Sequence, residues 1–89
     1  MFYVYILRTS SNTLYVGQTN NLEKRLEEHQ NKSNKSAKYV RYFRFVKLVY
    51  SEECRTRSEA MRREKQLKGW TRVKKEALIG GDSKLLRNL

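Results

Sequence analysis

The chain has 89 residues, a length typical of one small domain, which excludes a second domain within it. Hydrophobic residues make up 38% of the chain and aromatic residues 11%, so the composition supports a packed core and excludes a disordered tail. The chain has 20 Lys and Arg residues against 9 Asp and Glu, which gives a net charge of +11. Nucleic acid is the first expected partner of so basic a chain. The alternatives are that the protein has no dedicated partner or that it binds an anionic membrane surface.

The first two predicted elements form a β-hairpin. Residues 2–7, FYVYIL, are rich in β-branched and aromatic side chains, and polar residues at 9–12 end this strand in a turn. Residues 13–18, TLYVGQ, predict a second strand after a loop of about three to five residues. An odd loop length places on one face Tyr3, Tyr5, Tyr15 and Gly17, and on the other Val4, Ile6, Leu14 and Val16.

An amphipathic helix is predicted next. Asn20 or Asn21 is expected to cap it, and residues 22–30, LEKRLEEHQ, form its body. At about 100° per residue, one inner arc holds Leu22, Arg25, Leu26 and His29, whereas Glu23, Lys24, Glu27 and Glu28 fall outside it. The arginine and the only histidine therefore lie one turn apart on the inner face.

A cationic loop at 31–38, NKSNKSAK, is expected to lie near the partner. Residues 42–50, YFRFVKLVY, predict a third strand, and residues 51–54, SEEC, a turn. The three strands are expected to form one small sheet.

Two more helices are predicted. Thr56 and Glu59 form a capping-box pattern that opens a helix ending near Lys68, with Gly69 behind it. Its apolar stripe is Ala60, Met61 and Leu67, and Glu64 projects from the middle of that stripe. A shorter helix follows over 71–79 with Thr71 as its cap and with packing residues Val73, Ala77 and Leu78, and a last helical turn is expected over 83–89.

Five polar residues lie on predicted inner faces, where an apolar core would not place them: Tyr5, Tyr15, Arg25, His29 and Glu64. An inward arginine or glutamate is costly to desolvate unless it meets an opposite charge or a metal. Arg25 and Glu64 could simply pair as a buried salt bridge. Gly17 would then mark a bulge and His29 would cap a helix C-terminus. Alternatively, the five residues line one cleft that holds a phosphodiester.

The segments YVY at 3–5 and YVG at 15–17, followed by an arginine eight residues later, a histidine four residues after that and a glutamate on a later helix, resemble the GIY-YIG nuclease superfamily. The similarity is greatest to its small stand-alone bacterial branch, called YazA-like or YhbQ-like, and includes the long segment SEAMRREKQLKGWTRVKKEALI. Tyr3 and Val4 depart from the family's glycine and isoleucine. The resemblance implies an α+β fold, a three-stranded antiparallel β-sheet flanked by α-helices, over residues 1–79 with a short C-terminal extension at 80–89.

The resemblance also implies roles for the site residues. Tyr5 matches the general base with Tyr15 assisting, Gly17 allows close approach of the strand, and Arg25 clamps the phosphate. His29 helps to orient the phosphate or the tyrosines, and Glu64 matches the ligand of a single Mg²⁺ or Mn²⁺ ion. Contacts with nucleic acid are expected at Lys38 and Arg41.

The implied activity is metal-dependent hydrolysis of DNA phosphodiester bonds by in-line attack of water, by a nicking or structure-directed endonuclease. A non-catalytic nucleic-acid-binding module, or an adaptor on a nucleoprotein assembly, is the alternative. The protein is expected to be a monomer or weak dimer. Since Cys54 has no cysteine partner in the chain and no segment approaches roughly 18 apolar residues, a cytoplasmic location and no membrane are expected.

Overall fold

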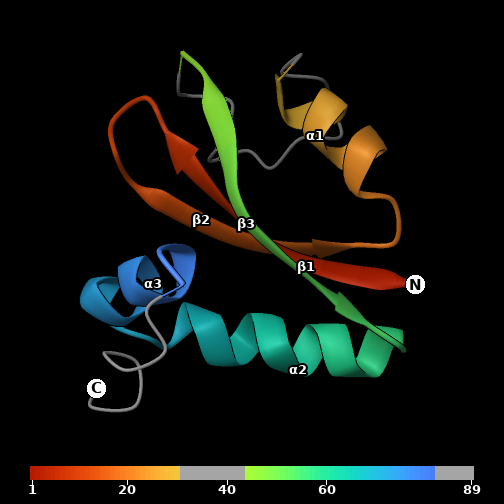
Figure 1. Ribbon diagram of the computed structural model, residues 1–89. Helices are drawn as coiled ribbons and strands as arrows, with labels where there is room; N and C mark the ends of the chain where they lie inside the picture. The colour runs from red at the N-terminus through yellow and green to blue at the C-terminus, as the bar shows by residue number, and fades with distance from the viewer. Residues whose placement is uncertain (31–43, 82–89) are drawn as a thin grey trace.

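The computed structural model describes residues 1–30 and 44–81 and confirms the α+β fold. Its elements are β1 (Phe2–Thr9), β2 (Leu14–Thr19), α1 (Leu22–Gln30), β3 (Val46–Cys54), α2 (Arg57–Lys68) and α3 (Arg72–Ile79). The three-stranded antiparallel sheet has the order β2-β1-β3, with α1 over one face and α2 and α3 over the other (Figure 1). None of the described helices is long and apolar enough to cross a membrane. The predicted cationic loop at 31–38, together with Lys38, Arg41 and the segment 83–89, lies outside the described residues.

The hairpin of β1 and β2 has the register that the sequence predicts. The Thr9 amide donates to the Thr13 carbonyl at 2.9 Å, and the loop between them contains Asn12 at a φ of 64°. Asparagine tolerates this left-handed conformation better than most residues, and such loops are common in hairpins. The pairing sets Tyr5 opposite Gly17, so both lie on the face that α1 covers.

The central strand β1 carries the core on both faces of the sheet. Its Val4 and Ile6 pack against Ala60 and Leu67 of α2. On the opposite face Tyr5 and Leu7 pack against the two leucines of α1, Leu22 and Leu26. All four of these strand residues are at most 1% exposed, so both helix layers are held to the same strand.

The third strand ends later than the sequence predicts; residues 44–45 are not part of it, and residues 42–43 lie outside the described residues. Residues 51–54, predicted to be a turn, pair instead with the first half of β1. Since β3 is an edge strand, Glu52 keeps its carboxylate partly exposed, and it pairs with Arg63 of α2 at 2.8 Å. The polar composition that indicated a turn is therefore compatible with a strand at a sheet edge.

The helix caps are predicted correctly, but the apolar stripes are each wrong at one position. The Thr56 hydroxyl accepts from the Glu59 amide at 3.1 Å. The Thr71 hydroxyl does the same at the start of α3. Met61 is 50% exposed and Val73 is 59% exposed. Met61 lies about 100° around the helix from Ala60, which takes it out of the arc that faces the sheet.

Candidate functional site

The absence of a side chain at Gly17 gives the Tyr5 phenol its position. A Cβ atom at Gly17 would lie 2.5 Å from the Tyr5 hydroxyl oxygen and 2.6 Å from its Cζ atom. Because the two residues face each other in the β1–β2 register, the phenol lies across the backbone of β2. β2 is an edge strand, so the phenol reaches toward the edge of the sheet. The register is continuous through Gly17, so the interpretation of this glycine as a bulge is wrong.

His29 is the hydrogen-bond partner of the Tyr5 hydroxyl. Its Nε2 atom lies 3.0 Å from the Tyr5 oxygen, and both residues are 1% exposed. Burial, together with the positive charge of Arg25, lowers the pKa of His29 to about 4. The imidazole is therefore neutral at pH 7. His29 lies in the last turn of α1, but a neutral imidazole lacks the positive charge on which the helix-capping interpretation depends.

Arg25 contacts the same hydroxyl from α1. Its guanidinium hydrogen-bonds with Tyr5, and its Nη1 atom pairs with Glu28 at 3.3 Å. Because an arginine can only donate, it occupies a lone pair of the phenol oxygen. The Tyr5 hydroxyl also shares a hydrogen bond with His29 Nε2, in which the donor is set by the imidazole tautomer, and His29 Nδ1 is a buried atom without a partner among the described residues.

The free protein holds this arrangement in its neutral state. Burial raises the pKa of Tyr5 to about 12, although the hydrogen bond and the charge of Arg25 act in the opposite direction. Tyr5 thus keeps its proton at neutral pH while His29 carries no charge.

Tyr15 completes the group of side chains around Gly17. Its ring lies nearly edge-on to the His29 ring, with 5.7 Å between centroids, and it is more exposed than Tyr5. A Cβ at Gly17 would also lie 3.2 Å from the Tyr15 ring. We call this group the Tyr5 cluster; its members are Tyr5, Tyr15, Gly17, Arg25 and His29.

Glu64 approaches the Tyr5 cluster from α2 on the other side of the sheet. Its carboxylate is close enough for its charge to contribute, as the smallest of several effects, to the raised pKa of Tyr5. The side chain is 22% exposed and pairs with Lys68 at 3.1 Å. Among the ion pairs of the described residues, Arg25 is joined to Glu28 and Glu64 to Lys68, and none joins Arg25 to Glu64.

Glu28 is the residue at the site that the sequence did not predict. It falls outside the predicted inner arc of α1, yet its side chain is only 17% exposed because it folds back onto Arg25. The spacing of three residues on a helix could have indicated this pair, since such side chains are neighbours.

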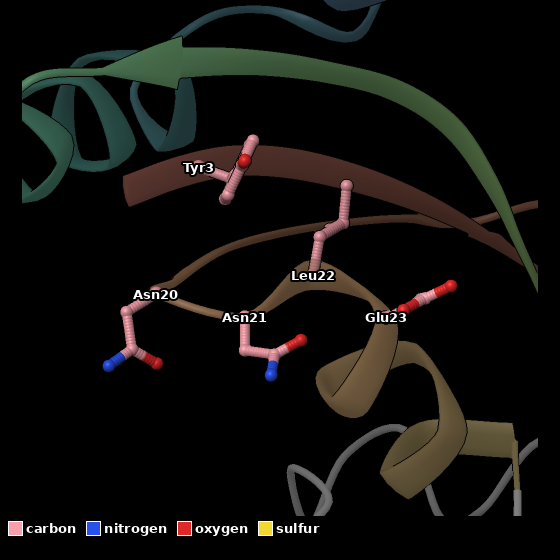
Figure 2. Close-up of a pocket in the computed structure, with 5 residues that line it drawn as sticks. All are labelled: Tyr3, Asn20, Asn21, Leu22 and Glu23. Atoms are coloured by element: carbon pink, nitrogen blue, oxygen red, sulfur yellow. The ribbon is translucent and has the colours of Figure 1, made fainter. Parts of the chain in front are cut away.

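A separate hollow lies beside the first turn of α1, lined by Tyr3, Asn20, Asn21, Leu22 and Glu23 (Figure 2). The Leu22 side chain points toward β1, whereas those of Asn20 and Asn21 point away from the sheet. None of these residues belongs to the Tyr5 cluster, so this hollow adds no group to its chemistry.

Comparison with known proteins matches residues 1–77 to the GIY-YIG catalytic domain. A UPF0213 protein of Clostridium perfringens is 47% identical over 83 residues, which cover 93% of this chain and 87% of that protein. A UPF0213 protein of Natronomonas pharaonis is 41% identical, with coverage of 91% and 93%. The solution structure of a UPF0213 protein from Bacillus halodurans, 35% identical, superposes with a TM-score of 0.58 over 92% of this chain and 86% of that one.

Replacement of Gly17 by alanine is expected to destabilise the protein by about 1–3 kcal/mol, because the added methyl group overlaps the Tyr5 phenol. The free energy of unfolding in urea measures this loss. Gly69→Ala is the matched control. Gly69 has a φ of −82°, and a Cβ atom there would lie 3.5 Å from the nearest atom, so this substitution should change the free energy of unfolding little. Equal losses in the two variants would contradict the assigned role of Gly17.

His29 is expected to titrate with a midpoint near pH 4, which NMR of the single histidine ring can follow directly. Its pKa is lower in the folded chain than the ordinary value of 6.5, so its stabilising effect is complete above about pH 6.5 and is lost as the pH falls toward 4. The free energy of unfolding should therefore fall more steeply over this range in the parent than in His29→Gln. A ring midpoint near 6.5 would refute the buried, neutral histidine.

Proposed function

The chain belongs to the GIY-YIG catalytic domain family, and on this premise we propose that it is a metal-dependent nuclease that hydrolyses phosphodiester bonds in DNA. The observation that carries the proposal is the hydrogen-bonded series Arg25–Tyr5–His29 laid across Gly17. It joins a phosphate-binding group, a hydroxyl and a proton acceptor within one small volume. The net charge of +11 would attract a polyanion such as DNA to this site.

Arg25 is the proposed phosphate clamp. A planar guanidinium can bind two phosphate oxygens at once, which fixes both the position and the orientation of the group to be attacked. Arg25 is 23% exposed and pairs with Glu28 at 3.3 Å, a distance longer than that of an optimal charged hydrogen bond. A phosphate would therefore compete with Glu28 for the guanidinium.

Tyr5 is the proposed general base, with Tyr15 beside it and His29 as the acceptor of the phenol proton. In the free protein this transfer is unfavourable, because the pKa of Tyr5 is about 12 and that of His29 about 4. The charge of Arg25 contributes to the low value at His29. A phosphate bound to Arg25 would offset that charge and make His29 a better acceptor when substrate is present.

Glu64 is the proposed ligand of a divalent cation, the cofactor that GIY-YIG nuclease domains generally use. One partly exposed carboxylate fits Mg²⁺, which retains most of its waters and takes few ligands from the protein. Within residues 1–30 and 44–81, no three His, Cys, Asp or Glu side chains are grouped for a closed metal site. A bound ion would supply positive charge for the scissile phosphate and for an ionised phenol.

A non-catalytic nucleic-acid-binding module is the second candidate. The burial of Tyr5, 1% exposed and with a raised pKa, favours it, because a general base has to be reached by water. The two functions differ in one property: only a nuclease needs the phenol proton to move.

Cleavage of supercoiled plasmid, branched DNA and single-stranded DNA, with and without Mg²⁺, tests the proposal. Arg25→Lys and Glu64→Gln are each expected to lower the rate of Mg²⁺-dependent cleavage by about 100-fold or more. Arg25→Lys removes the planar guanidinium that binds two phosphate oxygens, and Glu64→Gln removes the negative charge that holds the cation. Tyr5→Phe should lower the rate to the same extent, because it removes the hydroxyl and leaves the ring.

Lys24→Ala and Glu27→Gln are the matched controls, because both residues are exposed on the outer side of α1. They should cleave at the parent rate. Steep salt-dependent binding with no cleavage of any substrate would identify the binding module and overturn the nuclease.

A further inference from the structure

Helix α2 has two kinds of basic side chain. Arg63 pairs with Glu52 and Lys68 with Glu64, so their charges are neutralised within the protein. No carboxylate of the described residues pairs with the exposed cations of the same helix, Arg57, Arg62 and Lys65. They surround a hollow that also contains Met61, which is 50% exposed. We call the surface formed by Arg57, Met61, Arg62 and Lys65 the α2 outer face.

The α2 outer face begins next to Glu64. At about 100° per residue, Arg57, Met61 and Lys65 lie roughly 20°, 60° and 100° from Glu64 in one direction around the helix, and Arg62 lies about 160° away in the same direction. The buried Ala60 lies in the opposite direction, toward the sheet. A ligand held at Glu64 would therefore continue onto the outer face without crossing the core.

The same surface also continues past the end of β2. Arg57 borders a second hollow with Gln18, Thr19 and Asn20. Asn20 in turn borders the hollow beside the first turn of α1 (Figure 2). Shared residues thus connect three shallow depressions along the side of the sheet at which β2 lies, and Phe2 is the main apolar contributor to the middle one.

We propose that the α2 outer face binds the sugar-phosphate backbone of the nucleic acid whose scissile phosphate lies at the Tyr5 cluster, an inference that rests on the proposed function. Arg57, Arg62 and Lys65 bind phosphates of this backbone, and Met61 contacts the sugars between them. From Arg57 to Lys65 the helix rises about 12 Å, enough to reach about three phosphates of one strand. Charge complementarity selects this occupant, because an apolar partner would leave three cations desolvated without counter-charges.

The salt dependence of DNA binding tests the proposal. The dissociation constant for a fluorescein-labelled duplex of 20 base pairs is measured against KCl concentration in EDTA, which prevents metal-dependent cleavage. Arg62→Ala/Lys65→Ala removes two phosphate contacts, so the slope of log K against log[KCl] should fall by about two and affinity by at least tenfold at low salt. Met61→Ala should weaken binding without a change of slope.

Lys24→Ala/Lys47→Ala is the matched control, since it removes the same charge from exposed residues of α1 and β3. It should keep the parent slope. Equal effects of the two double variants, or no effect of either, would overturn the docking surface, even if Mg²⁺-dependent cleavage is found. A smaller slope of log K against log[KCl] in Arg62→Ala/Lys65→Ala alone would support the docking surface, even if no substrate is cleaved and the nuclease proposal fails.

Discussion

The contact between the Tyr5 phenol and the bare backbone of Gly17 is the constraint on which the site depends. Strand register puts the two residues opposite each other, and the missing side chain lets the phenol lie across the edge strand. Only there can α1, which returns over the same face, bring Arg25 and His29 to the hydroxyl. A slip of one residue would turn Tyr5 to the face of α2 and separate all these groups.

Charge is distributed unevenly around this contact. The ionised groups nearest the hydroxyl each have an internal partner: Arg25 has Glu28, and Glu64 has Lys68. Tyr5 and His29 are neutral, so the free site carries little net charge although the chain carries +11. A phosphate and a cation would take the places of the internal partners. On this account the free protein is a stable resting form, and substrate itself supplies the charges that change it.

The sequence predicts the hairpin and the inner face of α1 well, because side-chain periods of two and 3.6 residues leave little choice once the apolar residues are placed. It places β3 too early, since Glu52 and Glu53 resemble a turn until an edge position and the partner Arg63 are known. Met61 is misassigned because hydrophobicity alone does not show which side of a helix meets the sheet. Glu28 is missed because its burial comes from an ion pair with Arg25, which a count of apolar positions does not reveal.

We propose that the Tyr5 cluster holds the nucleic acid for reaction. NMR chemical-shift mapping of the labelled protein, titrated with a phosphorothioate-linked DNA oligonucleotide that resists cleavage, tests it most directly in the presence of Mg²⁺. The largest shifts are expected at the Arg25 side chain, the His29 ring, Tyr5 and the Gly17 amide. Saturable binding with shifts confined to β3 and α3, and none in the Tyr5 cluster, would exclude this position for the nucleic acid.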